Sequence, residues 1–204
     1  MMDMKTMDMK TMDWKALFDA LYPGFFAESS IRALPADGSW EEMALSLPGF
    51  SGRNVEIPVP DGIAFGLYRG ELQPLRAEIR RVDEGWPAYY DGRHRVYCAF
   101  DGDRVASFCL LEDMGTYRGL RVAGPGCVGT LPEYRRRGIG LRMVQNATAL
   151  LAAEGYDIGY IHYTGVGPWY ARLGYRTVLR WNRDGVVDQG FAEAPGWPQA
   201  GLSG

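Results

Sequence analysis

The segment between Leu131 and Leu141 constrains this chain more than any other, because a strand-like stretch runs there through a glycine- and arginine-rich turn into a long amphipathic helix. Gly138 and Gly140 would let the backbone approach an anion closely. The first turn of a helix leaves several N–H groups unbonded, and the helix dipole favours negative charge there. The run Arg135–Arg137 adds cationic donors. The segment therefore predicts a strand, a pyrophosphate-binding turn and a helix.

A second motif, from Pro168 to Tyr175, lies about thirty residues further along the chain. Together, the Arg135-x-x-Gly138-x-Gly140 spacing and this motif resemble the GNAT superfamily of acyl-CoA-dependent N-acetyltransferases. The later motif is similar to the family's aromatic-Tyr-x-x-x-Gly-aromatic pattern. The resemblance covers about residues 62–183 and implies that Tyr170 stands at the position of the family's usual catalytic tyrosine.

This resemblance implies an α/β (α+β) fold with a mixed, mostly antiparallel central sheet flanked by helices. We predict a partly helical N-terminal extension over residues 1–55, an acetyltransferase domain over 56–190 and a C-terminal tail over 191–204. The first thirteen residues contain a duplicated Met-Asp-Met-Lys-Thr, which is more typical of a frayed or duplicated start than of a functional element.

Apolar periodicity and turn residues predict the individual elements. A capping-box pattern at Ser39 also predicts a short helix over 39–46. The remaining predicted helices lie at 13–21, 72–82, 138–154 and 167–173, and the predicted strands lie at 63–69, 95–100, 104–111, 120–130, 156–163 and 175–182. We expect strands 120–130 and 156–163 to be parallel neighbours joined by the long helix, and to splay apart around the cofactor as the resemblance implies.

Composition narrows the function classes. A net charge of −3 and a pI near 5.5 argue against nucleic acid as a partner, since phosphate binding needs a broad basic surface. The sequence shows no secretory signal and no apolar run near the roughly 18 residues of a membrane span. We therefore expect a cytoplasmic protein without membrane partners. The three cysteines lack metal-ligand spacing, so we expect no metal and reduced, buried thiols.

The resemblance implies acetyl-CoA as co-substrate. Backbone amides around the turn would hold its pyrophosphate, and main-chain groups of the preceding strand would pair with pantetheine. Gly126 and Gly129 also fit a β-bulge, which is compatible with cofactor approach. The predicted cofactor-binding residues are Val128, Gly129, Thr130, Arg135, Arg136, Arg137, Gly138, Ile139, Gly140 and Leu141.

Proton transfer is the second task of such an enzyme. Tyr170 is the predicted general acid, because a phenol can protonate a departing thiolate. The strand before the turn lacks the carboxylate that some family members carry, so the candidate bases are Glu112, Asp113 and His162. Removal of the proton through ordered water remains an equal alternative, and a role for Cys127 as an acyl-carrying nucleophile is a further one.

Trp86, Tyr89 and Tyr90 form an aromatic cluster where the family builds its acceptor wall, although plain packing explains the cluster equally well. The leading hypothesis is direct acetyl transfer from acetyl-CoA to the primary amine of a small molecule. The alternatives are an acyl-CoA-binding regulatory module and a protein or peptide N-acetyltransferase. The N-terminal extension could form a homodimer contact under any of them.

Overall fold

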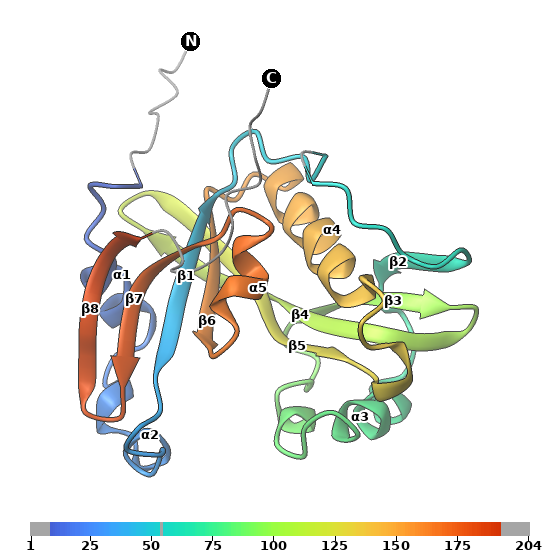
Figure 1. The fold of residues 1–204 in the computed structure, drawn as a ribbon, viewed down its shortest axis with the longest axis horizontal. Helices are drawn as coiled ribbons and strands as arrows, with labels where there is room; N and C mark the ends of the chain where they lie inside the picture. Colours follow the sequence, from blue (N-terminus) through green and yellow to red (C-terminus); the bar gives the residue numbers. More distant parts are fainter. Residues whose placement is uncertain (1–8, 54, 193–204) are drawn as a thin grey trace. The chain divides into compact units, whose positions relative to one another are not determined.

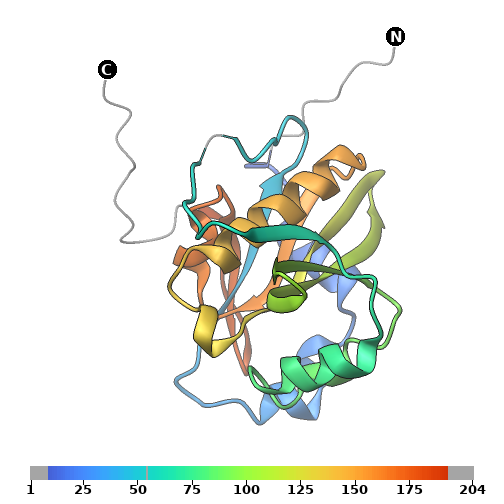
Figure 2. The same cartoon turned by 90° about the vertical axis from the view of Figure 1, so that its right-hand side faces the viewer.

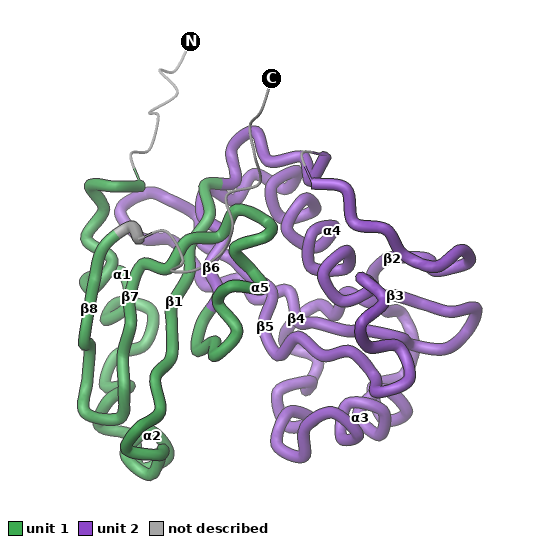
Figure 3. Tube along the Cα trace, in the orientation of Figure 1, with its two compact units in different colours: residues 1–46, 162–204 green, residues 47–161 purple. Residues whose placement is uncertain are grey.

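The computed structural model describes residues 9–53 and 55–192, with side chains through residue 190. The predicted start repeat lies largely outside the described residues, as does most of the tail predicted over 191–204. Two compact units divide the chain (Figure 3). Unit 1 combines Met1–Ser46 with His162–Gly204, and unit 2 is the continuous stretch Leu47–Ile161.

Unit 2 is built on a sheet with the strand order β2-β3-β4-β5-β6. Its strands are β2 (Ile63–Leu67), β3 (Arg95–Asp101), β4 (Arg104–Tyr117), β5 (Leu120–Thr130) and the first residues of β6 (Ile158–Thr164). The pairs from β2 to β5 are antiparallel. Strands β5 and β6 are parallel and pair only at Val122↔Ile158 and Ala123↔Gly159. The prediction of parallel neighbours is therefore confirmed, and the sheet is mixed and mostly antiparallel.

Two helices complete unit 2 (Figures 1 and 2). Helix α3 (Leu72–Arg80) lies between β2 and β3 in the chain and buries Leu75 and Ile79. Helix α4 (Ile139–Ala153) joins β5 to β6 and packs on β3, β4 and β5. Both helices begin and end within two residues of the predicted bounds, because each carries one apolar face at helical spacing.

Unit 1 contains an antiparallel β1-β7-β8 arrangement. Its strands are β1 (Trp40–Ser46), β7 (Arg176–Asn182) and β8 (Gly185–Ala192), and its helices are α1 (Trp14–Leu21), α2 (Ser29–Arg32) and α5 (Gly167–Ala171). Helix α1 lies behind β7 and β8 in Figure 1 and contacts both strands, and α5 contacts β7. The end of β6, from His162, also belongs to this unit.

One prediction in unit 1 is wrong. Residues 39–46 were expected to be helical, but Trp40–Ser46 is the strand β1, paired with β7 from Trp40↔Trp181 to Ala44↔Arg176. A capping box is a local signal, and here pairing with a distant strand together with complete burial of Met43 and Ala44 overrides it. Strand β8 was not predicted either; it follows β7 after a tight turn.

Each unit has its own buried apolar residues. In unit 2 they lie where α4 meets the sheet and include Cys98, Phe108, Met143 and Val144, none of which is exposed. In unit 1 the ring of Phe25 contacts two other aromatic rings. Its centroid lies 5.3 Å from that of Phe18 and 5.0 Å from that of Trp181. No helix of the described residues combines the length and apolar character needed to cross a membrane.

Candidate active site

The predicted anion-binding turn lies at the start of α4, in unit 2. Gly138 is the N-cap of this helix, in the left-handed region at φ +76°, and no side chain caps the helix start. The first bond along the helix runs from the Arg142 N–H to the Gly138 carbonyl at 3.0 Å. The N–H groups of Ile139, Gly140 and Leu141 therefore lie in the first turn, where a helix has no internal acceptor for them. They are available to an anion.

Gly138 is required at this position for two reasons. Its positive φ is strained for any residue with a side chain. A Cβ there would also overlap the carbonyl oxygen of Pro58 and approach Ile57 Cγ2 to 3.3 Å. Residues 55–58 are held beside α4 by a bond of 2.7 Å from Gln145 Nε2 to the Val55 carbonyl. The sequence predicted the glycine, but the packing of this segment against it is a finding of the structure.

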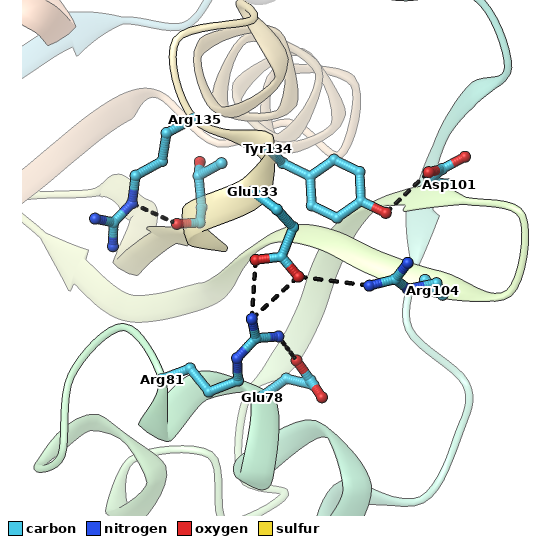
Figure 4. A network of polar contacts seen from close by, with 8 residues as sticks. Glu78, Arg81, Asp101, Arg104, Glu133, Tyr134 and Arg135 are labelled. Atoms are coloured by element: carbon cyan, nitrogen blue, oxygen red, sulfur yellow. Dashed lines mark hydrogen bonds and ion pairs between the residues drawn. The ribbon is translucent and has the colours of Figure 1, made fainter.

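The three arginines of the turn have different surroundings. Arg135 Nε donates to the Thr130 carbonyl at 3.0 Å, so this side chain ties the turn back to the end of β5 (Figure 4). The Arg137 guanidinium lies 6.0 Å from the centroid of the Tyr134 ring. Arg136 is exposed and adopts φ +61°. Arg136 and Arg137 thus keep exposed side chains beside the start of α4, while Arg135 supports the backbone.

A polar network fixes the turn to the rest of unit 2 (Figure 4). Glu133 accepts from Arg81, at the end of α3, with its two oxygens at 3.1 and 2.9 Å, and it pairs with Arg104 on β4 at 3.4 Å. The Tyr134 hydroxyl donates to Asp101 at 2.8 Å. Because these groups are largely exposed, each ion pair adds little stability, but together they orient the turn.

Strand β5 carries a β-bulge just before the turn. Opposite β4, Gly129 pairs with Phe108 and Gly126 pairs with Leu110, so Cys127 and Val128 together face the single residue Cys109. Cys127 has φ +44°. A bulge interrupts the regular ladder and re-aims backbone groups, which suits the approach of an extended ligand. The predicted bulge is thus present among the predicted cofactor-binding residues Val128, Gly129 and Thr130.

The bulge is held by side chains of unit 2. The Tyr90 hydroxyl donates to the Cys127 carbonyl at 2.8 Å, and Ser107 Oγ donates to the Gly129 carbonyl at 2.6 Å. A Cβ at Gly129 would overlap the ring of Phe108. The two hydroxyl groups, and the lack of a side chain at Gly129, therefore fix the path of the backbone through the bulge.

The three residues of the predicted acceptor wall, Trp86, Tyr89 and Tyr90, differ in how much of their surface is exposed. Tyr90 is buried, and its ring packs edge-on against Phe108 at 5.7 Å, so it supports the bulge and cannot line an open wall. Burial is also the main cause that raises the pKa of Tyr90 well above its ordinary value. Trp86 is half-buried and Tyr89 is 58% exposed. Only these last two keep surface that an acceptor could contact.

The candidate bases on β4 have different positions. The carboxylate of Glu112 lies against Gly126, where a Cβ would overlap its oxygen Oε1. Asp113 instead accepts from the Gly115 N–H and the Tyr156 hydroxyl, both at 2.9 Å, and the first of these is the main cause of its lowered pKa. Glu112 therefore lies beside the bulge, whereas Asp113 is already engaged by its neighbours.

The thiols do not resemble nucleophiles. Burial, with smaller contributions from the charges of Glu112 and Asp83, raises the pKa of Cys127 to about 12. Cys98 and Cys109 are buried, and desolvation raises the pKa of each far above its ordinary value. These surroundings disfavour a thiolate at neutral pH.

His162 lies in unit 1, where it contacts a carboxylate that the sequence analysis did not identify. His162 Nδ1 is 2.9 and 3.1 Å from the two oxygens of Glu42 on β1. Glu42 is completely buried, while 22% of the His162 side chain is exposed. Sequence reasoning missed Glu42 because it placed residues 39–46 in a helix, and the two residues are 120 positions apart. Nothing in the local sequence signals this contact.

Tyr170 is also in unit 1, on α5. It is 6% exposed, and its ring contacts Trp169 edge-on at 4.8 Å and Tyr175 at 6.2 Å. The carboxylate of Glu41 lies against Gly167, the first residue of α5. Successive residues of a strand point to opposite faces, so Glu41 and Glu42 connect β1 to α5 on one face and to His162 on the other.

Residues with a strained backbone lie both near the anion-binding turn of unit 2 and near His162 of unit 1. Four non-glycine residues have positive φ in the described part of the chain: Arg118, Cys127, Arg136 and Tyr163. Arg118 lies in the turn between β4 and β5. The other three lie at the bulge, in the anion-binding turn and directly after His162. Such strain persists only where the surroundings enforce it, and it is concentrated at functional sites in proteins.

Two cavities of about 380 and 390 Å³ lie elsewhere in unit 2. They share Arg93, His94 and Arg95, and the first is crossed by a double ion pair from Arg95 to Glu154 with both N···O distances at 2.6 Å. No predicted site residue except Asp113 lines either of them.

Comparison with known proteins supports the predicted family. Residues 92–177 match the model of the acetyltransferase (GNAT) domain. This range runs from just before β3 to the start of β7 and includes the bulge, the anion-binding turn, His162 and Tyr170. No curated protein sequence matches the chain.

Solved structures share the fold. One is the glucosamine N-acetyltransferase region of a fungal multi-domain GH3 β-N-acetylglucosaminidase, with 23% identity and a TM-score of 0.57 over 71% of this chain and 20% of that chain. Another is a GCN5-related N-acetyltransferase from Sphaerobacter thermophilus, with 19% identity and a TM-score of 0.50 over 70% of this chain and 49% of that chain. The chain thus spans about a fifth of the first and half of the second, and the likeness shows the GNAT fold alone.

Proposed function

Because residues 92–177 carry an acetyltransferase (GNAT) domain, we propose that this protein transfers an acetyl group from acetyl-CoA to the primary amine of a small molecule by direct transfer. One observation carries the proposal: a glycine-capped, side-chain-free start of α4 follows a bulged β5 within a few residues. The first feature suits a pyrophosphate and the second suits an extended pantetheine arm.

The residues fit acetyl-CoA at both positions. The N–H groups of the first turn of α4, together with Arg136 and Arg137, would hold the pyrophosphate. Main-chain groups of Val128, Gly129 and Thr130 would hold pantetheine, and one N–H there would stabilise negative charge that develops on a carbonyl oxygen. When bound, acetyl-CoA supplies an activated thioester.

Tyr170 is the proposed general acid. Its hydroxyl would donate a proton to the sulfur that leaves as the new amide forms, which lowers the cost of expelling a thiolate. Burial of its ring between Trp169 and Tyr175 restricts the side chain to few orientations. The raised pKa of the half-buried Cys127 thiol supports direct transfer without an acyl-enzyme.

The acceptor is proposed to be a small amine with an apolar, planar or sugar-like body. Trp86 and Tyr89 retain aromatic surface for stacking against such a body. The similar fungal region is described as a glucosamine N-acetyltransferase, so amino sugars belong first in any acceptor screen. A homodimer, and a cytoplasmic location, stay predictions from the sequence.

Two measurements test this function. Calorimetry with acetyl-CoA should show saturable binding, and absence of binding at millimolar cofactor would contradict the proposal. Thiol release should then be measured across amino sugars, aromatic amines, polyamines and peptide N-termini. Turnover with small amines is the expected result. Binding without turnover would favour an acyl-CoA-binding regulatory module, and turnover confined to peptides would favour a protein N-acetyltransferase.

A further inference from the structure

We propose that His162 is the proton acceptor of this reaction and that Glu42 is its positioning residue, the two forming a dyad in unit 1. The inference rests on the proposed function. It supplies the base that strand β5 does not provide, and the residue that positions this base lies on β1, a segment before the matched acetyltransferase domain.

The Glu42 carboxylate is held by three donors. Oε1 accepts from Trp181 Nε1 at 2.8 Å and from the Tyr163 N–H at 3.1 Å, and Oε2 lies 2.9 Å from His162 Nδ1. A carboxylate with no exposed surface needs such donors to stay ionised. An ionised carboxylate can only accept, so Nδ1 must carry a hydrogen. In the neutral imidazole the lone pair is then on Nε2.

The plane of the imidazole ring is also fixed. Tyr22, which follows α1, stacks on it with a centroid distance of 3.8 Å and an interplanar angle of 14°. Phe25 contacts it edge-on at 5.2 Å. The titratable groups that contact the ring are thus Glu42 from β1, Tyr22 after α1 and the adjacent Tyr163 of β6. Because part of the side chain remains exposed, the ring is oriented without being sealed off.

The residue that follows His162 has a strained backbone and is bonded to the same carboxylate. Tyr163 adopts φ +54°, and its N–H donates to the same Glu42 oxygen that the indole of Trp181 reaches. Glu42 thereby holds both the imidazole and the peptide that follows it. This combination of a buried charge, a fixed tautomer and backbone strain is more than packing alone requires.

The proton balance of the step is simple. The amine nitrogen forms a bond to the acetyl carbon while the carbon–sulfur bond breaks. The proton that the nitrogen loses goes to His162 Nε2, and the departing sulfur receives a proton from Tyr170. Solvent then takes one proton from His162 and returns one to Tyr170, which restores both residues. Glu42 stays ionised throughout and stabilises the imidazolium that forms, as a buried carboxylate does for other catalytic imidazoles.

The tautomer can be measured without any activity. His94 and His162 are the chain's only histidines, so nitrogen NMR of the imidazoles gives two sets of signals, which His94→Gln assigns. Above neutral pH, His162 should show hydrogen on Nδ1, whereas a free imidazole favours Nε2. Hydrogen on Nε2 in the folded wild-type protein would overturn the dyad, whatever the enzyme's substrate.

The pH–rate profile then tests the role of the base. His162→Gln should lower kcat by about 100-fold and remove the acid limb of kcat/KM. Glu42→Gln should lower kcat by about tenfold or more and change the shape of that limb, because the imidazole loses the carboxylate that orients it. His94→Gln, the matched control in unit 2, should leave both unchanged. Far-ultraviolet circular dichroism reports whether each variant is folded.

Three outcomes separate the dyad from its rivals. A limb that survives in both variants but disappears in Glu112→Gln would assign the base to the carboxylate beside the bulge and overturn this proposal. Full activity of folded His162→Gln would overturn it as well. Failure of the wild-type protein to bind acetyl-CoA would refute the proposed function instead, and that failure is read in calorimetry, independently of the NMR result.

Discussion

The proposed acetyl-CoA cradle of unit 2 and the proposed Glu42–His162 dyad of unit 1 are built in opposite ways. The cradle is made of backbone: N–H groups at the start of α4 and the bulge of β5, within a short contiguous stretch. The dyad is made of side chains that lie 120 positions apart. A site of the first kind is encoded by glycines and spacing, whereas the second depends on which strands pair. The two regions should therefore respond differently to substitution.

The largest effect is expected at Gly138, where the cradle has no tolerance for a side chain. Gly138→Ala should cost about 2–4 kcal/mol of folding free energy, since positive φ alone costs about 1–2 kcal/mol and the new methyl also meets the Pro58 carbonyl. Acetyl-CoA binding should weaken at least tenfold. Chemical denaturation and calorimetry measure the two effects.

Gly102 offers a matched control in the β3–β4 turn. It has φ +57°, but a Cβ there would meet nothing within 4 Å. Gly102→Ala should therefore show only the strain of about 1–2 kcal/mol, with cofactor affinity unchanged. Equal losses of affinity in the two variants would mean that the backbone at Gly138 has no special part in the cradle.

A side-chain role is tested next at Tyr170. Tyr170→Phe removes the hydroxyl and keeps the ring packed between Trp169 and Tyr175. We expect kcat to fall about 100-fold while the Kd for acetyl-CoA stays the same. Steady-state kinetics and calorimetry separate the two. Tyr97→Phe, a buried tyrosine on β3, is the control, and a normal kcat in Tyr170→Phe would show that another group protonates the sulfur.

This contrast also explains what the sequence could predict. Helix α4, its glycine cap and strand β5 follow from local periodicity and turn chemistry, so their positions and the bulge were foreseen. Glu42 was not, because a capping-box pattern pointed to a helix and only the register Glu42↔Leu179 reveals the strand. Burial of Tyr90 was also open, since an aromatic residue in a loop serves a wall or a core equally well from sequence.

A smaller effect is expected at Glu154, just after the C-terminal end of α4 and away from both regions. Its bond to Arg95 is the main cause that lowers its pKa below the ordinary 4.5. A carboxyl with a lowered pKa stabilises the fold above that ordinary value and loses the effect as the pH falls through its folded-state pKa. Glu154→Gln should thus cost at most about 1 kcal/mol at pH 7 and almost nothing below about pH 3. Denaturation at several pH values measures this, and any change in acetyl-CoA affinity would show that the two ends of α4 are coupled.

The smallest effect is expected at Cys127, the one reactive side-chain type inside the backbone-built cradle. With a pKa of about 12, only about one thiol in 10⁵ is ionised at pH 7. Cys127→Ala should keep kcat within about twofold, and iodoacetamide should modify the native thiol far more slowly than the unfolded one. An acetyl adduct on Cys127, trapped by acid quench and located by mass spectrometry, would contradict direct transfer. It would also weaken the distinction between a cradle built from backbone and a dyad built from side chains, because the cradle would then contribute a side chain to the chemistry as well as backbone groups to binding.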